Sequence, residues 1–376
     1  MCTVCLCEVA FIFVLGLALN AFVIPCISLV SFRKRLFDTV DARKIHQGFI
    51  PRLGGVSFFP CITISLCLTL TIHFLVCDVN LLQDSATALQ LLSICSCLFL
   101  LYLMGIMDDL IGVRYRSKFA VQILCSILIV ASGLYFDNLY GLFGIYALPL
   151  WLGIPFTVFI LVFILNAINL IDGIDGLASG LGAIAFLSLG CIFVSLGWWV
   201  YAFISFASLG VLVPFFYYNV FGQARRGRKI FMGDTGSLTI GLLLGVLVLK
   251  LSSTDVVKDS LIPGSILVAF SFLIVPLMDV IRVVIHRLRC GRSPFLPDKN
   301  HIHHKFMALG FTQRQSMVAI VCIALFFAFG NGWLIHYFSV TPLLLADIAI
   351  WTLGHICMTW KINQTKIQSK EIITSK

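Results

Sequence analysis

The sequence predicts an all-α polytopic membrane protein with about eleven transmembrane helices, its N-terminus outside and its C-terminus in the cytoplasm. Composition is the first observation behind this prediction: 60% of the 376 residues are hydrophobic and 11% are charged, whereas soluble domains carry about 25% charged residues. Long apolar runs are the second observation, and the placement of Lys and Arg between them is the third. Together they indicate one integral membrane domain over residues 1–376, ending in a polar cytoplasmic tail at 359–376.

Eleven apolar runs follow one another along the chain, and each predicts a helix because about 20 apolar residues span the hydrocarbon core of a bilayer. The first run has no basic segment before it and is too long for the core of a signal peptide, so we expect a retained helix. The run at 236–251 is short and is expected to extend into a flanking loop. The sequence Gly197-Trp198-Trp199 divides the sixth run from the seventh. The runs are 4–30, 55–77, 86–107, 119–136, 145–165, 177–196, 198–220, 236–251, 261–285, 316–338 and 340–360.

The basic residues give the predicted orientation. All 26 Lys and Arg residues except Lys250 and Lys258 lie in, or at the ends of, alternate connections. The positive-inside rule assigns that set of connections to the cytoplasm. The net charge of +9 therefore reflects topology and contact with anionic lipid headgroups, and we expect no nucleic-acid partner.

The 14 cysteines lie mostly inside apolar runs, where they are expected to pack as small hydrophobic residues. Cys2, Cys5 and Cys7 are closely spaced, but no second pair of Cys or His accompanies them in the sequence. The spacing therefore argues against a zinc site there, and no disulfide framework is implied.

Four polar clusters interrupt this apolar chain, and all four fall in the predicted cytoplasmic connections. The most distinctive cluster extends from Asn166 to Gly176, and polar residues recur in it at every third position. On a helix or 3₁₀ turn they would form one polar stripe, and the glycines would let a ligand approach the backbone. The alternative is a glycine-rich membrane turn with incidental polar groups. The clusters are Asp108-Asp109, Asn166–Gly176, Gly233–Ser237 and His301–His304.

The other three clusters each allow a structural and a functional reading. Adjacent acids at 108–109 are either a solvated helix end or a site balanced by Arg114, Arg116 and Lys118, which could also grip phosphate. The sequence at 233–237 is either a helix cap or a place for a divalent cation or phosphate. The histidines at 301–304 do not match the spacing of a zinc helix. Because lysines lie beside them, these histidines favour a binding site for phosphate or sugar, and a zinc site is the alternative.

Taken together, the clusters supply many carboxylates, some cations, a Mg²⁺ site and no Ser or Cys nucleophile motif. Phosphoryl transfer needs such a set, because its transition state spreads negative charge over phosphate oxygens and is stabilised by positioning and by cations.

Four motifs then occur in a fixed order: DDxxxxxxxxK with Asp108, Asp109 and Lys118, NAxNxxDGxDGLA at 166–178, FMGDxGS at 231–237 and SPFxPDxxHIHH at 293–304. In this order they resemble the polyprenyl-phosphate N-acetylhexosamine-1-phosphate transferases. An early segment with Lys44 and His46, followed by Pro51 to Gly55, fits the same family. The resemblance covers nearly the whole chain. It implies an active site in cytoplasmic loops, with UDP-N-acetylhexosamine and a polyprenyl phosphate lipid as substrates and UMP as a product.

The resemblance also assigns roles residue by residue. Asn169 and Asp234 would hold Mg²⁺, with Mn²⁺ as the alternative ion. Asp108 and Asp109 would orient or deprotonate the lipid phosphate, and Asp172 would support the metal region; these three form the catalytic set. The substrate-binding set has phosphate, uracil and sugar contacts; it comprises Lys118, Asn166, Asp175, His301, His303, His304, Lys44 and His46.

The spacing of the histidines separates two branches of this family. Ile302 stands between His301 and His303, which resembles the N-acetylglucosamine branch; phospho-N-acetylmuramoyl-pentapeptide transferases tend to carry three consecutive histidines and are the alternative. A transporter of lipid-linked or nucleotide sugars is the alternative from another class, although transporters place ionisable groups near the bilayer midplane and helix centres here nearly lack them. The resemblance implies a multi-pass protein of the bacterial cytoplasmic (inner) membrane, as a monomer or a homodimer, whose product starts an O-antigen, capsule or cell-wall glycan.

Overall fold

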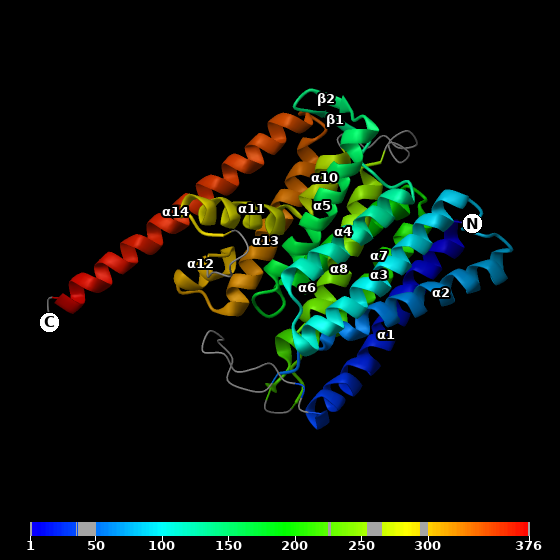
Figure 1. The fold of residues 1–376 in the computed structure, drawn as a ribbon, viewed down its shortest axis with the longest axis horizontal. Coiled ribbons are helices and arrows are strands. Elements are labelled where there is room, and N and C mark those ends of the chain that lie inside the picture. The colour runs from blue at the N-terminus through cyan, green and yellow to red at the C-terminus, as the bar shows by residue number, and fades with distance from the viewer. Residues whose placement is uncertain are drawn as a thin grey trace.

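The computed structural model describes residues 2–34, 36, 50–224, 227–253, 265–293 and 300–374, and Figure 1 shows that they form an elongated bundle of helices. Lys44 and His46, two of the predicted substrate-binding residues, lie outside the described residues. The elements, in chain order, are α1 (Cys2–Lys34), the 3₁₀ helix η1 (Gly54–Ser57), α2 (Phe58–Cys77), α3 (Ser85–Ile111), α4 (Tyr115–Ala131), β1 (Asn138–Leu142), β2 (Ile145–Ala147), α5 (Leu150–Ile171), α6 (Leu177–Ser195), α7 (Trp199–Phe221), α8 (Gly233–Leu251), α10 (Ser265–Ser271), α11 (Ile274–Arg289), α12 (Ile302–Ala308), α13 (Gln313–Leu334) and α14 (Val340–Thr374).

Every predicted apolar run contains a helix. Within the described part of the chain, nine helices are long and apolar enough to cross a membrane. The two remaining runs contain α4, which has 17 residues, and the pair α10–α11, which is bent by 78° at a short break. The protein is thus an all-α, multi-pass membrane protein. The count of eleven spans and the orientation of the N-terminus stay predictions.

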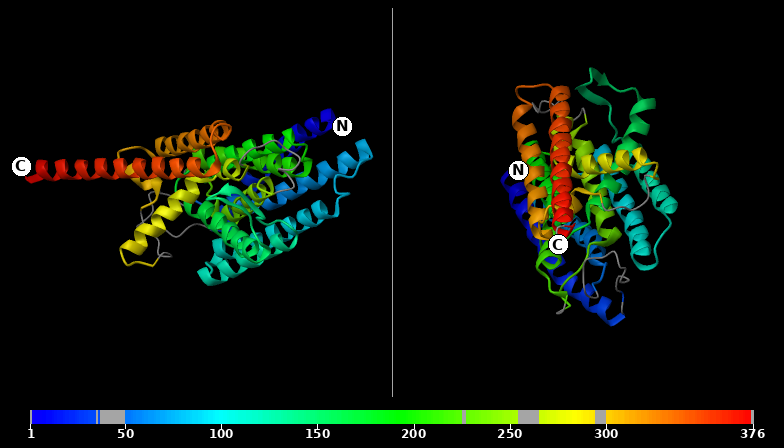
Figure 2. Two further views of the ribbon diagram at one scale, coloured as in Figure 1. Left: turned by 90° about the horizontal axis from the view of Figure 1, so that it is seen from above. Right: turned by 90° about the vertical axis from the view of Figure 1, so that its left-hand side faces the viewer.

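Several helix boundaries differ from the expected ones for local reasons. The fifth run was expected to begin at residue 145, but β1 and β2 form an antiparallel hairpin there. Gly141 and Gly144 have φ of +82° and +77° and permit its turn, and α5 begins only after Pro149. At the other end of the chain, α14 continues to Thr374 through the predicted polar tail, and it extends well beyond the bundle (Figures 1 and 2).

Side chains from the adjoining chain segment cap the first turns of α3 and α13. Asp84 accepts hydrogen bonds from the backbone N–H groups of Ala86 and Thr87 at the start of α3. Thr312 and Gln315 form a reciprocal capping box at the start of α13. Each cap satisfies N–H groups that have no partner within the helix. The predicted division at Gly197-Trp198-Trp199 is confirmed, because α6 ends at Ser195 and α7 begins at Trp199.

Helix α8 lies at the centre of the bundle, packed against α3, α5, α6, α7 and α10. Of the 18 most apolar consecutive residues of α8, 94% are buried inside the protein, whereas the corresponding share for α1 is 22%. Small residues allow this close packing: a Cβ on Gly105 of α3 would overlap the backbone of Thr235, and one on Gly241 would lie 3.1 Å from the Cα of Leu165 in α5. The start of α8 is therefore held from several sides by neighbouring helices, and the candidate site is built there.

Candidate active site at the start of helix α8

The side chain of Asp234 joins residues from three of the four motifs. Its Oδ1 accepts a hydrogen bond of 3.0 Å from Nδ2 of Asn169, at the end of α5. Its Oδ2 is ion-paired with Nζ of Lys118, in the first turn of α4. The same amide of Asn169 donates to Oγ of Ser237 at 2.8 Å. Residues up to 116 positions apart in the sequence thus meet around one carboxylate, as expected if the motifs converge on one site.

Asp109 caps helix α8 from the neighbouring helix α3. Its carboxylate accepts hydrogen bonds from the backbone N–H groups of Asp234 at 2.8 Å and Thr235 at 3.0 Å, and from Oγ1 of Thr235 at 2.6 Å. The first N–H groups of a helix have no partner within it, and the positive end of the helix dipole favours an anion. Asp109 therefore fixes where α8 begins and, with it, the backbone that carries Asp234.

Asp108 holds Lys118 next to Asp234. Its Oδ2 lies 3.2 Å from Nζ of Lys118, and its Oδ1 accepts a hydrogen bond of 2.7 Å from the backbone N–H of Val113. One ammonium group is thus shared by two carboxylates. The acid pair at 108–109 is more than a solvated helix end, because both side chains are directed to partners that build the site.

The segment Pro51–Gly55 is paired with the backbone just before α8. Gly54 and Gly55 donate to the carbonyl oxygens of Phe231 and Met232 at 2.9 and 2.8 Å, and Phe231 donates back to Pro51 at 2.9 Å. A Cβ on Gly55 would overlap the backbone of Gly236. Glycine at position 55 is therefore required by close backbone approach, and it sets the level at which the first turn of α8 lies.

The segment from Asn166 to Gly176 does not form the continuous helical stripe that its spacing predicts. Helix α5 ends at Ile171, Asp172 follows it, and Gly176 has φ of +80°. The side chain of Asn166 donates at 2.7 Å both to Oε1 of Gln122 in α4 and to the carbonyl of Val162. Of the two amide side chains on the helix, Asn169 contacts Asp234 and Asn166 does not. The prediction of one continuous polar face was wrong from Asp172 onward, because the glycine-rich backbone is no longer helical there.

Asp172 is half-buried and close enough to Asp234 and Asp109 for their charges to act on its carboxyl group. Burial, followed by the negative charges of Asp234, Asp175 and Asp109, raises the pKa of Asp172 to about 7, and Arg52 acts in the opposite direction. Asp175 in turn is ion-paired with Lys229, with 2.5 Å between Oδ2 and Nζ. Negative charge therefore exceeds the nearby positive charge in this region, and a bound cation would stabilise it.

The histidine segment reaches the site through His303. Its imidazole lies against Gly173, where a Cβ would overlap the ring. The ring is stacked with that of His301 at 5.9 Å and tilted by 47° against that of His304 at 4.2 Å, measured between ring centroids. Burial and then the charges of His304 and His301 lower the pKa of His303 to about 3. His303 is therefore neutral at physiological pH and would act through hydrogen bonds rather than charge.

His301 is anchored by Asp279 of the bent helix pair. Nδ1 of His301 lies 2.9 Å from Oδ2 of Asp279, and the contact is a hydrogen bond when the imidazole is neutral and an ion pair when it is protonated. Oδ1 of Asp279 also accepts a hydrogen bond of 3.0 Å from the backbone N–H of Ile302. Arg282 is ion-paired with Asp279 at 2.8 Å, as their spacing of three residues predicts. Asp279 thereby fixes the first residue of α12 and the orientation of the imidazole.

We expect Asp279→Asn to lower both stability and activity. A neutral amide cannot accept from all of its present partners, and Arg282 would lose its counter-charge; breaking a buried charge pair costs about 3–5 kcal/mol. Thermal unfolding of the purified protein should therefore shift to lower temperature, and substrate turnover should fall with it. The control is Arg289→Gln, which changes an exposed charge on the same helix. An unchanged melting temperature in Asp279→Asn would contradict this anchoring role.

The donor set fits a Mg²⁺ ion. Asp234, Asn169, Asp108 and Asp172 offer carboxylate and amide oxygens, the hard ligands that this ion prefers. Burial first, and then the negative charges of the neighbouring carboxylates, raises the pKa of Asp172, and the ammonium of Lys118 lies between Asp108 and Asp234, where a cation is favourable. These residues bear out the expected proximity of Asn169 and Asp234, while the identity of the ion stays a prediction.

Sequence reasoning missed several residues that build the site. Lys229 pairs with Asp175, and Asn219 accepts from the backbone N–H of Gly176 at 2.6 Å while it donates to the carbonyl of Ile230 at 2.9 Å. Asn219 is a polar residue at the end of a long apolar run, which was a usable signal. Lys229 was assigned to topology alone, because nothing in a linear sequence distinguishes an ion-paired lysine from a solvated one.

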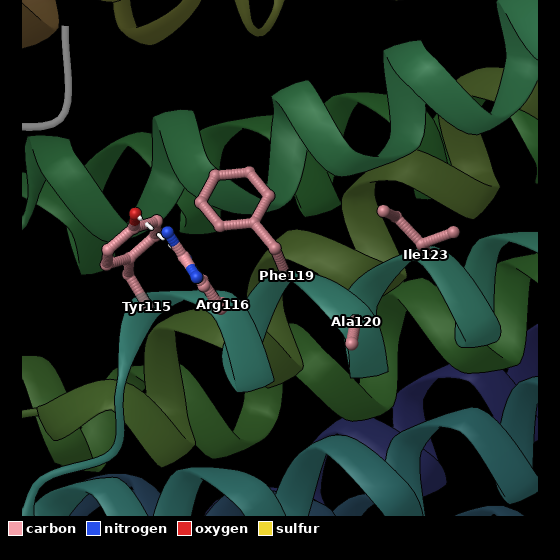
Figure 3. A pocket seen from close by; sticks show the side chains of 5 residues that line it. All are labelled: Tyr115, Arg116, Phe119, Ala120 and Ile123. Carbon is pink, nitrogen blue, oxygen red and sulfur yellow. Dashed lines mark hydrogen bonds between the residues drawn. The ribbon is translucent and has the colours of Figure 1, made fainter.

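A shallow hollow on α4 is separate from these residues. It is lined by Tyr115, Arg116, Phe119, Ala120 and Ile123, and Figure 3 shows that all five side chains come from one stretch of that helix. Nε of Arg116 donates to the hydroxyl of Tyr115 at 3.3 Å. Arg116, named above as a possible phosphate contact, lines it, but no residue of the four clusters does, so this hollow is not the place where the clusters meet.

Comparison with known proteins gives consistent relatives. The family model described as Glycosyl transferase family 4 matches residues 91–252. An undecaprenyl-phosphate alpha-N-acetylglucosaminyl 1-phosphate transferase of Yersinia pestis is 33% identical over 297 residues, covering 78% of this chain and 76% of the relative. The protein of that name in Escherichia coli strain K12 is 32% identical over 343 residues, covering 89% and 87%. A Bacillus subtilis relative, also named for undecaprenyl-phosphate N-acetylglucosaminyl 1-phosphate transfer, is 30% identical over 340 residues, covering 90% and 85%.

Proposed function

The chain belongs to glycosyl transferase family 4, and from this membership we propose that it transfers N-acetylglucosamine-1-phosphate from a UDP-sugar to undecaprenyl phosphate, with release of UMP. The relatives are named for this transfer to undecaprenyl phosphate and match most of the chain. The observation that carries the proposal in the structure is the contact of Asp234 with both Asn169 and Lys118, because it joins the motifs of three separate segments in one charged site.

The proposed reaction exchanges one phosphoanhydride for another. An oxygen of the lipid phosphate attacks the phosphorus that carries the sugar, and a new P–O bond forms there. The bond from that phosphorus to the bridging oxygen breaks, and UMP leaves with the oxygen and its electron pair. A phosphate monoester is largely ionised at neutral pH, so the step needs no general base from the protein. Catalysis is then mainly positioning and stabilisation of charge.

Lys118 and the carboxylates around it would bind the diphosphate. A Mg²⁺ ion held by Asp234 and Asn169, with Asp172 beside them, would neutralise charge on the phosphate oxygens. The ammonium of Lys118, held by Asp108, is placed to contact a phosphate oxygen by a charge-assisted hydrogen bond. Asp109 acts as a positioning residue in this proposal, because its oxygens already accept three hydrogen bonds from the start of α8.

The histidine segment and Asp175 would bind the remainder of the UDP-sugar. Neutral His303, whose buried Nδ1 has no hydrogen-bond partner among the described residues, can donate to or accept from a sugar or phosphate group. Asp175, paired with Lys229, is assigned to the uracil end. The lipid phosphate would approach from the membrane, where the spans of a multi-pass protein meet the headgroups.

The finer points of the proposal follow from the same relatives. We place the protein in the bacterial inner membrane, with its product starting a surface or cell-wall glycan. The muramoyl-pentapeptide reaction is less well supported, because the relatives are named for N-acetylglucosaminyl transfer. A transporter is also less well supported, since the ionisable groups described above gather at one end of α8 rather than along a path through the bundle.

Release of UMP tests the proposal directly. Purified full-length protein would be incubated with undecaprenyl phosphate, Mg²⁺ and one of three donors: UDP-N-acetylglucosamine, UDP-N-acetylgalactosamine or UDP-N-acetylmuramoyl-pentapeptide. We expect UMP and a lipid-linked product with UDP-N-acetylglucosamine, and none when the lipid or the divalent cation is left out. Turnover with the muramoyl donor alone would overturn the choice of sugar, and no UMP with any donor would overturn the reaction.

We expect Lys118→Ala to raise the KM for the UDP-sugar by about tenfold or more, since a lost charge-assisted contact costs about 1.5–3 kcal/mol. Initial rates over a range of UDP-sugar concentrations measure the effect. Arg289→Ala is the control, because it removes an exposed cation at the end of α11 that has no proposed contact with substrate. Equal KM values for Lys118→Ala and the wild type would show that Lys118 does not bind the diphosphate.

A further inference from the structure

Three buried side chains at the far end of the helix pair α1–α2 could share one metal ion. Ligand atoms of Cys5, Glu8 and His73 all lie within 4.8 Å of one another. Cys5 and Glu8 are three residues apart on α1 and so share a face, and His73 faces them from the last turns of α2. No other group of three His, Cys, Asp or Glu residues meets that distance anywhere in the described ranges.

This group is separate from the candidate active site. His73 follows Gly55 by 18 residues along η1 and α2, and at 1.5 Å per residue that is about 27 Å. Figure 1 shows the N-terminus of α1 beside the C-terminal end of α2, at the end of the bundle away from α12. Changes in the group can therefore be tested without removing a residue that contacts substrate.

Two polar atoms in the group lack a partner. Oε2 of Glu8 and Nδ1 of His73 are 2.8 Å apart, but Oε1 of Glu8 and Nε2 of His73 are buried with no hydrogen bond in the described structure. Glu8 is 6% exposed and His73 1%. Burying such atoms without partners is unfavourable, and a carboxylate within a membrane helix is more unfavourable still. A cation bound by both side chains would satisfy these atoms.

The donor set points to zinc. Mg²⁺ and Ca²⁺ select oxygen ligands, whereas this group offers one sulfur, one oxygen and one nitrogen. Zn²⁺ binds Cys, His and Glu in tetrahedral sites, and three protein ligands leave one position for water. Its bond lengths place tetrahedral ligand atoms about 3.3–3.8 Å apart, so small side-chain rotations from the present arrangement are sufficient. We propose that Cys5, Glu8 and His73 bind Zn²⁺ and thereby link the start of α1 to the end of α2.

The spacing of the cysteines in the sequence argues against zinc near the N-terminus, and the reason lies in how zinc motifs are recognised. A zinc motif is recognised from paired ligands at short intervals, and Cys2, Cys5 and Cys7 have no second pair near them. The third ligand here lies 65 residues after Glu8. Only the packing of α2 on α1 brings it close.

Cobalt binding to full-length protein tests the proposal. Co²⁺ would be added to metal-free protein in detergent with excess Mg²⁺ present, so that oxygen sites are occupied. We expect about one Co²⁺ per chain, the near-ultraviolet absorption band of a thiolate bound to cobalt, and loss of that band when Zn²⁺ displaces it. Zinc should also raise the melting temperature of the wild type. Absence of the thiolate band in the wild type would overturn the proposal.

Matched variants identify the ligands. Cys5→Ser should abolish the thiolate band, and His73→Gln should lower the metal content to a small fraction of the wild-type value. Cys7→Ser is the control, because Cys7 is exposed two residues away and its loss should leave the band intact. An unchanged band in Cys5→Ser would overturn the site. Should Cys5→Ser fail to fold, X-ray absorption of zinc-loaded wild type decides instead, since a first shell without sulfur excludes Cys5.

Discussion

Asp234→Ala is expected to abolish UMP release while the protein still folds and inserts. Its carboxylate is the common partner of Asn169 and Lys118, so its loss separates both the proposed metal ligands and the proposed phosphate contact. Loss of one preorganised electrostatic group typically costs about 10²–10³ in rate, and removing a group on which two others depend should cost at least the upper value. The rest of α8 keeps its packing, because its core is apolar and buried on all sides.

UMP release at saturating substrates, together with size-exclusion elution and thermal unfolding, measures both parts of this expectation. Asp78→Asn is the control, since Asp78 is exposed at the C-terminus of α2 in the left-handed region that Asn tolerates well. Wild-type turnover in Asp234→Ala would remove Asp234 from the reaction. A variant that elutes as an aggregate would instead show that the side chain of Asp234 is needed for folding, and Asp234→Asn, which keeps the size of the side chain and an oxygen that can accept the hydrogen bond from Asn169, would then test the loss of the negative charge.

Gly55→Ala should have the second-largest effect, on stability and activity together. The added Cβ would overlap the backbone of Gly236 and approach the carbonyl of Met232 at 2.7 Å. Backbone atoms cannot rotate away, so η1 and α8 must separate. Overpacking of this kind costs about 1–3 kcal/mol and sometimes more. Asp234 lies two residues before Gly236, so the displacement also moves the carboxylate on which the site depends.

Melting temperature and UMP release again give the measurement. Gly330→Ala is the control, because a Cβ at that helical position meets no atom within 4 Å and Ala is the better helix former. We expect the control to match or exceed the wild type in stability. Wild-type stability and turnover in Gly55→Ala would mean that the close approach of η1 to α8 is not required.

Most of the helices could be predicted from the sequence, because a span needs only length and apolar character. Each apolar run contains a helix, and the short run at 236–251 extends back to Gly233 as expected. The exceptions arise where local geometry prevails. Strand β2 takes up the first residues of the apolar run at 145–165, and the bend between Ser271 and Ile274 divides a run that is continuous in composition.

The sequence predicts many of the residues that form the site, but not the hydrogen bonds and ion pairs between them. The clusters were expected to converge on the cytoplasmic side, and the contact of Asn169 with Asp234 is consistent with that. A pairing such as Asp109 with Thr235 joins residues 126 positions apart, and hydrogen bonds between helices depend on the packing, which no local pattern encodes. The spacing of Asp279 and Arg282 predicts only their ion pair, whereas Asp279 also holds His301, 22 positions further along the chain.

The burial of α8 has a consequence for how the protein is made. Its neighbours α3, α5, α6 and α7 precede it in the chain, so during synthesis they leave the ribosome first. The central position in the bundle is therefore occupied only after four of its surrounding helices have been made. Because α8 also carries Asp234, the contacts of Asn169 and Lys118 with that carboxylate form only once this later segment is in place.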